Sequence, residues 1–290
     1  MALYALRAEP DLTAPTLIVA LDGWVDAGMA GTLAATQLAD GGAVVATFDG
    51  DVLYDFRARR PTLEIVDGRL QQLTWPELAL RRARVGERDI LVLSGHEPDF
   101  HWPTLSAAIV ELTGRLGVAE WISLGSIPAA VPHTRPVTIL GTESAPGLLR
   151  GDIAPGPSGI LRVPAAAISV LEKVVAEAGI PALGYFAQVP HYVSGPYPAA
   201  AVELLRAVGR HLGAEPELGT LPDEARQLRS RLDVAAASDD TTRSYVERLE
   251  SMSDEARLPA GDDLISDIER FLRERGAEGP PGGPGSGRPN

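Results

Sequence analysis

The chain has 290 residues, of which 45% are hydrophobic and 22% are charged, a composition typical of a globular protein with one large domain or two small ones. Its formal net charge is −13 and its arginines are interleaved with carboxylates, so neither nucleic acid nor an anionic membrane surface is expected as a partner. It contains no cysteine, which excludes disulfides and cysteine-ligated metals; it also lacks a signal-peptide pattern and any apolar run near the ~20 residues of a membrane span, so we expect a cytoplasmic location.

Apolar segments of strand length alternate with helical segments along most of the chain. Runs such as residues 16–21 (TLIVAL) are typical of strands buried on both faces, and the helical segments are flanked by Asp, Pro or Gly at the expected ends. This repetition predicts an α/β fold with a mostly parallel sheet covered by helices on both faces and connected by right-handed crossovers. The predicted strands are 16–21, 43–48, 89–94, 120–125, 137–141 and 182–189, and the predicted helices are 26–39, 102–116, 164–178 and 198–212.

An antiparallel hairpin is predicted between the second and third of these strands. Residues 62–66 and 69–75 surround Asp67-Gly68, which is a strong signal for a two-residue turn. Residues 76–84 then read as a short helix, because proline is favoured at a first helical position.

The pattern changes after Gly213. Residues 214–275 are rich in charge and predict a helical extension to a core domain of residues 1–213, with a break at residues 259–261. Residues 276–290 are rich in Gly and Pro and are expected to form a flexible tail. The extension carries an apolar stripe at helical spacing, made of Leu221, Leu228, Leu232, Tyr245 and Leu249.

Polar residues follow the predicted strands, at the edge of a parallel sheet where ligands bind. After the first strand, Trp24 and Asp26 either line a pocket for a neutral or cationic group, or Asp26 caps the following helix. After the second strand, Asp49, Asp55 and Arg60 lie among further Asp and Arg residues. That segment forms either a structural ion-pair network or a divalent-ion site, and it does not match a calcium-binding loop.

Histidines accompany the next strand ends. Glu97, Asp99 and His101 alternate in sequence, so they either share one face as a metal-binding set or Asp99 caps the helix that follows. His133 and Arg135 lie between two prolines, where they either act as general base and anion clamp or belong to a stiff packing loop.

Two further candidates lie later in the chain. Ser158 has no Gly-x-Ser-x-Gly frame, so an ordinary turn is the alternative to a ligand contact, and His191 follows the last predicted strand.

Six segments, in order and over roughly residues 1–230, together resemble the proteasome assembly chaperone family, type two, in its single-chain prokaryotic form. The resemblance implies a three-layer α/β/α sandwich with a partly barrelled sheet, similar to nucleoside phosphorylases and hydrolases. It also implies self-association, most readily as a trimer, and a protein-binding role. The segments are Gly23–Gly28, Tyr54–Pro61, Glu97–Asp99, Val131–Pro136, Gly156–Leu161 and Val189–Val193.

Two functions therefore stand as hypotheses. The first is an oligomeric, protein-binding protein similar to an assembly chaperone. It is favoured by the resemblance, by the helical extension and by the lack of a complete catalytic nucleophile motif in the sequence. The alternative is a hydrolase, a phosphorylase-like enzyme or a binder of a nucleoside-like or amine-bearing ligand. In that case Asp26 or Glu97 acts as acid or base, His133 carries protons, Arg60 and Arg135 hold an anion and Trp24 stacks on the ligand. Neither hypothesis calls for a cofactor or a metal ion. The full ligand-contact set is Trp24, Asp26, Asp49, Asp55, Arg60, Glu97, Asp99, His133, Arg135, Ser158 and His191.

Overall fold

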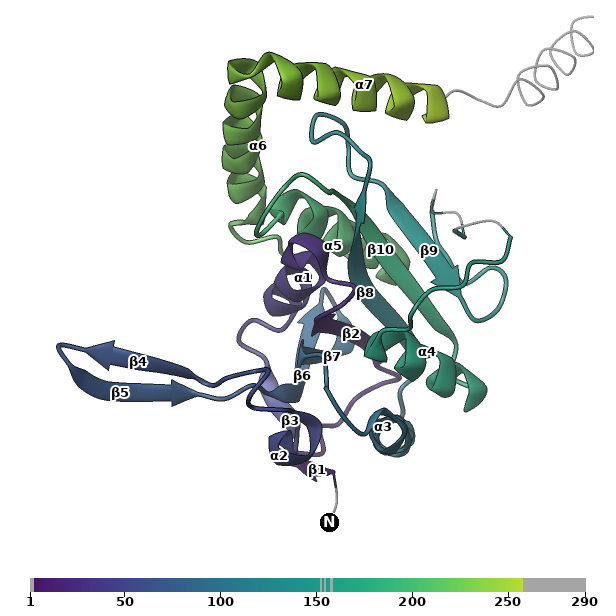
Figure 1. The fold of residues 1–290 in the computed structure, drawn as a ribbon. Coiled ribbons are helices and arrows are strands. Elements are labelled where there is room, and N and C mark those ends of the chain that lie inside the picture. The colour runs from purple at the N-terminus through teal and green to yellow at the C-terminus, as the bar shows by residue number, and fades with distance from the viewer. Residues whose placement is uncertain (1–2, 152, 154, 157–158, 258–290) are drawn as a thin grey trace, which may run out of the picture.

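The computed structural model of the chain describes residues 3–151, 153, 155–156 and 159–257. Its main element is a mixed eight-stranded sheet with the strand order β1-β3-β6-β7-β2-β8-β10-β9 (Figure 1). In chain order the elements are β1 (Tyr4–Leu6), β2 (Thr16–Asp22), the 3₁₀ turn η1 (Ala27–Met29), α1 (Ala30–Leu38), β3 (Ala43–Phe48), α2 (Gly50–Leu53), β4 (Thr62–Val66), β5 (Arg69–Thr74), β6 (Leu78–Val85), β7 (Arg88–His96), α3 (Trp102–Arg115), β8 (Glu120–Ala129), β9 (Ile139–Glu143), α4 (Ala167–Glu177), β10 (Ala182–Pro190), α5 (Pro198–Leu212), α6 (Leu221–Ser238) and α7 (Asp240–Arg257).

The predicted parallel arrangement is found in the centre of the sheet. β2 runs parallel to both β7 and β8, and β10 runs parallel to β8. The flanking strands β1, β3, β6 and β9 are all paired antiparallel to their neighbours. The sheet is therefore mixed, with the carboxyl ends of its four parallel strands at one edge.

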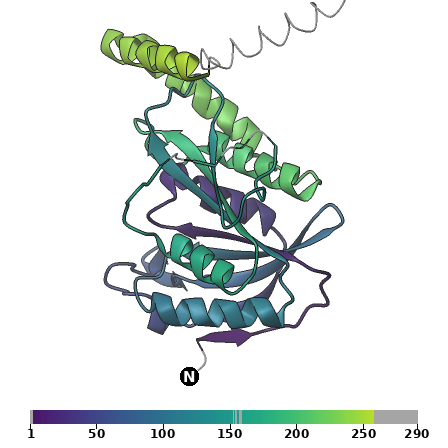
Figure 2. The same ribbon diagram turned by 90° about the vertical axis from the view of Figure 1, so that its right-hand side faces the viewer.

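Helices cover both faces of the sheet, as the uninterrupted apolar strands predict (Figure 2). On β2, Ile18 joins the buried cluster that includes residues of α1 and α5, while Leu17 and Val19 join the cluster that includes residues of α3 and α4. Helix α1 lies close to the sheet because its buried face is built from Ala and Gly. A Cβ atom at Gly31 would lie only 2.9 Å from the carbonyl oxygen of Leu124 on β8.

Residues 76–84 were predicted to be helical, but from Leu78 onward they belong to strand β6 (Leu78–Val85), so that prediction was wrong. β6 pairs antiparallel with β7 over its whole length, from Leu78 opposite Gly95 to Val85 opposite Arg88. The two strands are joined by a two-residue turn with Gly86 at φ 56°. Burial of Leu78 and Leu80 in the sheet outweighs the helical preference of the Leu, Ala and Arg residues around them.

The predicted hairpin at Asp67-Gly68 is confirmed. Both turn residues have positive φ values, 50° and 76°, as a two-residue hairpin turn requires. β4 and β5 form a sheet of their own that projects from the body of the protein (Figure 1).

The C-terminal extension consists of two helices set at an angle. Leu221 of α6 is buried in the core cluster, and Leu228 and Leu232 pack against it. The chain turns at Asp239, which accepts hydrogen bonds from Thr242 at the start of α7. The predicted break at residues 259–261 and the predicted tail at 276–290 lie outside the described residues. Among the helices that are described, none has both the length and the apolar character needed to cross a membrane.

Candidate functional site

Asp26 anchors the connection between β2 and α1. Its side chain is 8% exposed and its Oδ1 accepts a hydrogen bond of 2.8 Å from the backbone of Gly31, while its Oδ2 accepts one of 2.5 Å from the hydroxyl of Thr32. Ser126 on β8 also reaches Oδ1 at 3.5 Å. Burial raises the pKa of Asp26, although the bonds from Thr32 and Gly31 act in the opposite direction. Asp26 therefore accepts N–H groups from the first turn of α1, as a capping residue does, but the N-cap position of α1 is Met29, whereas the sequence predicted Asp26.

Glu97 joins two separate loops. One carboxylate oxygen accepts the backbone N–H of Trp24 at 2.9 Å and the other accepts the backbone N–H of Ala167 at 2.7 Å. The residue is 8% exposed, and a Cβ atom at Gly23 would lie 2.3 Å from its Oε2. Both oxygens of Glu97 therefore hold backbone, and the glycine before Trp24 makes room for that contact.

Asp99 belongs to an ion-pair network with the segment after α2. It accepts a hydrogen bond from the backbone of Asp55 at 3.0 Å and from Nε of Arg59 at 3.1 Å. The interpretation of Asp99 as the cap of α3 was wrong, because the N-cap position is His101, with φ 60° and no side-chain capping bond. Of the predicted ion-pair network after the second strand, the described residues show one pair, Arg59 with Asp99, while the Asp55 carboxylate accepts the backbone N–H of Arg57 at 2.9 Å.

The remaining candidates of this region have local roles or lie outside the described residues. Asp49 caps the short helix α2 through a 3.1 Å bond from the backbone of Asp51. Arg60 is exposed. Ser158 lies outside the described residues.

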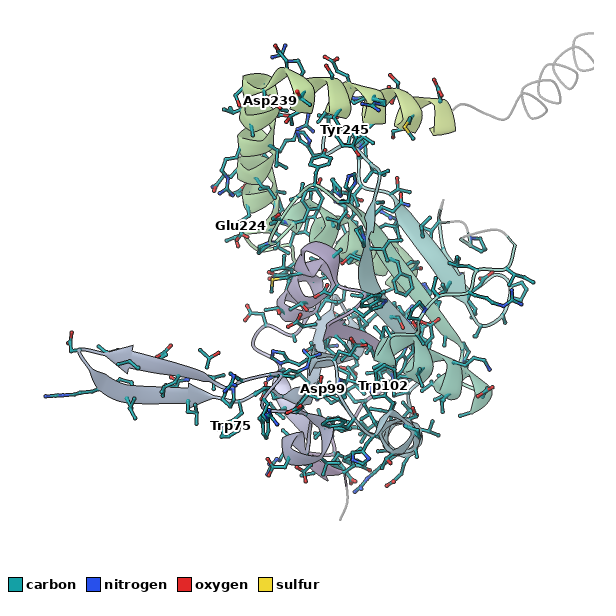
Figure 3. The ribbon with its side chains drawn as sticks, viewed as in Figure 1. Trp75, Asp99, Trp102, Glu224, Asp239 and Tyr245 are labelled. Carbon is teal, nitrogen blue, oxygen red and sulfur yellow. The ribbon has the colours of Figure 1, made fainter. Side chains whose placement is uncertain are left out.

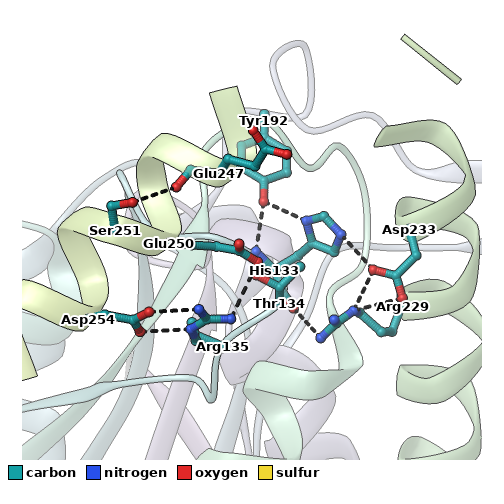
Figure 4. A network of polar contacts seen from close by, with 10 residues as sticks. All are labelled: His133, Thr134, Arg135, Tyr192, Arg229, Asp233, Glu247, Glu250, Ser251 and Asp254. Carbon is teal, nitrogen blue, oxygen red and sulfur yellow. Dashed lines mark hydrogen bonds and ion pairs between the residues drawn. The ribbon is translucent and has the colours of Figure 1, made fainter. Parts of the chain in front are cut away.

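His133 is the most enclosed of the predicted catalytic residues, at 4% exposure. Its Nδ1 lies 2.7 Å from the hydroxyl of Tyr192, which also accepts the backbone N–H of His133, and its Nε2 lies 3.2 Å from Asp233 of α6 (Figure 4). The Tyr192 oxygen accepts the backbone N–H of His133, so the hydroxyl proton of Tyr192 can be donated to Nδ1 of the ring. Nδ1 is then an acceptor, and we assign the proton of the neutral imidazole to Nε2, which faces Asp233. Arg229 donates both to Asp233 and to the carbonyl oxygen of His133.

Arg135 holds helix α7. Its Nε and Nη2 donate to the two carboxylate oxygens of Asp254 at 2.8 and 2.7 Å, a bidentate pair (Figure 4). Its Nη1 reaches Glu250 at 3.4 Å, and the neighbouring Thr134 hydroxyl donates to the same carboxylate. The predicted anion clamp therefore exists, but the anion it holds belongs to the same chain.

His191 makes a third contact with the extension. Its Nε2 lies 3.0 Å from the hydroxyl of Tyr245 on α7, and its Nδ1 lies 3.0 Å from the carbonyl oxygen of Ala129 at the end of β8. The rings of His191, Tyr192 and Tyr245 pack edge to face. The two C-terminal helices therefore contact the loops that follow β8 and β10.

The structure brings together only part of the predicted set. His133, Arg135 and His191 form one cluster, which we call the docking seam, together with their partners on α6 and α7. Asp99 lies in a different part of the molecule from Tyr245 of that seam (Figure 3). Within the described ranges, no three His, Asp or Glu side chains are grouped so that they could hold a metal ion.

Sequence reasoning missed the helix residues of the docking seam. They lie about a hundred positions after the His133 loop, so no local spacing could connect the two parts. Only the position of Asp233, Glu250 and Asp254 on an amphipathic, charged extension indicated that these carboxylates could contact the core. The missed helix residues are Arg229, Asp233, Tyr245, Glu250 and Asp254; Tyr192, which follows β10, was missed as well.

A cavity of about 790 Å³ lies beside the docking seam, between the His133 loop and α6. Four arginines line it, but each is paired with a carboxylate: Arg135 with Asp254, Arg206 with Glu203, Arg226 with Asp223 and Arg229 with Asp233. The imidazole of His133 has partners on both nitrogens, and burial raises the pKa of Tyr192, which disfavours a reactive phenolate. The arrangement is suited to holding the helices in place rather than to activating a nucleophile.

The docking seam should make stability depend on pH. Burial and the Arg229 charge lower the pKa of His133 below its ordinary value of 6.5, in spite of Asp233. Between the lowered value and 6.5 the unfolded chain binds a proton that the folded chain does not, so stability rises with pH through this window and is lost as pH falls below 6.5. We expect urea unfolding at pH 5.5 and pH 8 to show a smaller difference in His133→Gln than in the unmodified chain.

Circular dichroism at pH 8 is the control, since both proteins should have the same helix content there. An identical pH dependence in the two proteins would contradict the assignment of this titration to His133.

Comparison with known proteins gives a consistent set of matches. The model of the PAC2 family matches residues 20–236. A Corynebacterium glutamicum ATCC 13032 protein of unknown function is 32% identical with a TM-score of 0.82, covering 88% of this chain and 97% of its own. A Mycobacterium tuberculosis proteasome-assembly chaperone homologue is 31% identical with a TM-score of 0.72, covering 80% and 99%. Pyrococcus furiosus PbaB, an archaeal proteasome activator, shares the fold at 15% identity and a TM-score of 0.64, covering 80% and 97%. No curated protein matches the chain.

Proposed function

Because this chain belongs to the PAC2 family, we propose that it is a homo-oligomeric protein of the cytoplasm that binds proteasome subunits during the assembly of a larger complex. The observation that carries the proposal is the family match over residues 20–236, together with a solved relative, 31% identical, that is a proteasome-assembly chaperone homologue. A trimer is the assembly that the sequence resemblance implies, and it forms part of the same proposal.

The internal bonding of the polar residues supports a binding role over a catalytic one. Asp26 and Glu97 use their carboxylates to hold backbone N–H groups, and His133 and Arg135 use their side chains to hold α6 and α7. A general acid or base needs an approach path to the proton that it transfers, and His133 is 4% exposed.

Exposed apolar side chains near the same edge of the sheet supply a surface for a protein partner. Trp24 is 69% exposed, and Ile160, Leu161 and Val163, in the segment before α4, are between 60% and 82% exposed. Glu97 holds the backbone of Trp24 and that of Ala167, the first residue of the helix into which the second segment leads. Exposed apolar patches mark interaction sites, and Trp is among the residues that most often anchor a protein interface.

The test is capture of purified proteasome subunits from the organism that encodes the chain. We expect the immobilised chain to retain them, and we expect Trp24→Ser combined with Leu161→Ser to reduce retention at least tenfold, because hot-spot aromatic residues each contribute about 2 kcal/mol or more. The readout is the amount of each subunit in the eluate.

Val234→Ser is the matched control, because Val234 is equally exposed, at 71%, but lies on α6. It should retain the subunits as the unmodified chain does. Failure of the unmodified chain to retain any proteasome subunit would overturn the proposed function.

One observation favours the alternative of a small-molecule binder. A cavity of about 480 Å³ lies at the carboxyl ends of β2 and β7 and is lined by Asp22, Asp40 and Glu77. His96 also lines it, and the Nδ1 of His96 is buried without a hydrogen-bond partner. Carboxylates around a cavity suit an amine-bearing ligand, and a sheet like that of the nucleoside phosphorylases, as the resemblance implies, would favour a nucleoside. Thermal shift with adenosine and with primary amines, lost in Asp22→Asn, tests this alternative; no shift with any of them would exclude it.

A further inference from the structure

The hairpin β4–β5 has one apolar face. In the register of the two strands, Leu63 lies opposite Leu73, and Ile65 lies opposite Leu70. Leu63 and Ile65 are two positions apart on β4 and so point to the same side, and directly opposed residues share a side in an antiparallel pair. The register shift between the two pairs places the extra residue on β5, which keeps all four side chains together.

This face is open to solvent in the single chain. Leu63, Ile65, Leu70 and Leu73 are 43%, 59%, 71% and 48% exposed, and every residue of both strands is exposed. The hairpin points away from the body of the protein (Figure 1). A two-stranded hairpin is at best marginally stable alone, so a defined apolar face on such a hairpin indicates that another surface covers it.

A suitable surface lies at the base of the hairpin. A groove of about 700 Å³ is lined by Tyr4, Phe48, Phe56 and Trp75, and Trp75 directly follows β5 and packs on Phe56 with ring centroids 4.8 Å apart. Its wall includes the short strand β1, which forms one edge of the main sheet. The apolar face of the hairpin and the aromatic groove are therefore adjacent on one molecule but face the solvent separately.

The charged strand residues of the hairpin lie away from its apolar face. Glu64 alternates with Leu63 and Ile65 on β4, and Arg69 pairs with Val66, so Glu64 and Arg69 point to the opposite side. The chain as a whole carries −13, so a segment that is close to neutral and projects from the body is where two copies approach at the lowest electrostatic cost.

We propose that the β4–β5 hairpin is a self-association arm, whose apolar face is covered by the aromatic groove of a second copy of this chain. The four apolar side chains and Trp75 expose several hundred Å², a large part of the ~800 Å² per partner that a stable interface buries. Each copy gives an arm and receives one, so the contacts are all satisfied in a closed ring, such as the proposed trimer, in which they run head to tail. The inference rests on the self-association included in the proposed function and identifies the surface responsible for it.

Sedimentation velocity of the purified full chain tests the arm. We expect an oligomer at 10 µM, and we expect Leu63→Ser combined with Leu73→Ser to shift it to monomer by at least a tenfold weaker association. The matched control is Glu64→Ser combined with Thr74→Ser, on the opposite face of the same strands, which should leave the mass unchanged. The substituted residues lie outside both core clusters, so all variants should keep the melting temperature of the core.

Cysteine crosslinking tests where the arm lies, since the chain has no cysteine of its own. A mixture of Ile65→Cys and Ala5→Cys chains should form a disulfide-linked dimer on mild oxidation, because Ala5 lines the groove. A mixture of Glu64→Cys and Ala5→Cys should not. A monomeric unmodified chain, an oligomer that the Leu63 and Leu73 changes leave intact, or equal crosslinking in the two mixtures would overturn the proposal.

The two proposals fail separately. An oligomeric chain that retains no proteasome subunit overturns the proposed function and leaves the arm supported. If the apolar face of the arm lost solvent exposure only when proteasome subunits were added, the arm would be a surface for those subunits. That result would overturn self-association through the arm.

Discussion

Glu97→Ala is expected to lower the free energy of unfolding by about 3 kcal/mol, because it leaves two backbone N–H groups without their charged acceptor in a buried position. A loss of this size in a chain of this length lowers the melting temperature by roughly 6–12 °C. Glu97→Gln keeps one acceptor oxygen, so its free energy of unfolding should lie between those of the unmodified chain and of Glu97→Ala. Urea or thermal unfolding followed by circular dichroism measures all three proteins.

Glu87→Ala serves as the control, because the Glu87 side chain is fully exposed and such surface changes stay within about 0.5 kcal/mol. The catalytic interpretation makes the opposite prediction: a Glu97→Ala chain of normal stability that has lost a reaction. An unchanged melting temperature would show that the two N–H groups find other acceptors and that Glu97 is not structural.

Leu221→Ala is expected to destabilise the whole chain by about 3 kcal/mol, the usual cost of a cavity at a buried leucine. Leu221 is the first residue of α6, yet it is 5% exposed and belongs to the same cluster as Ile18 of the central sheet and Leu204 of α5. A predicted domain boundary at residue 213 would separate it from that cluster. We expect a single unfolding transition, shifted as a whole, in chemical denaturation followed by hydrogen exchange.

Val234→Ala is the matched control for this change. Val234 lies on the same helix but is 71% exposed, so its loss should cost no more than about 0.5 kcal/mol. If Leu221→Ala increased exchange only in α6 and α7 and left the core transition in place, the extension would be an independent unit and the boundary at 213 would stand.

The elements that the sequence predicts well are those with a local cause. The strand at residues 16–21 is apolar on both faces because both faces are covered, and the hairpin turn follows from Asp67-Gly68 alone. β6 was missed because Pro76 suits the first position of a helix, whereas pairing with β7 decides the structure of the residues after it. The two-residue turn at Gly86-Glu87 was the signal that would have corrected it.

The candidate residues were found, but their partners were not. Position after a strand end identifies His133 and Arg135 as exceptional, and both are indeed engaged in an unusual set of charged contacts. What they contact depends on where α6 and α7 return to the sheet, and that path is decided by Leu221, Leu249 and the turn at Asp239. A sequence pattern cannot distinguish an arginine that awaits a ligand from one that already holds a carboxylate of its own chain.

A single carboxylate that carries two loops also has a mechanical consequence. A protein that binds the indole of Trp24 exerts force on a loop whose backbone is held by Glu97. The same carboxylate also holds the first residue of α4. If either loop moved away alone, its backbone N–H would lose the hydrogen bond to Glu97, and the buried carboxylate would lose one of its two donors. We therefore expect a partner that displaces the Trp24 loop to shift the start of α4 as well, because both are held by the carboxylate of Glu97.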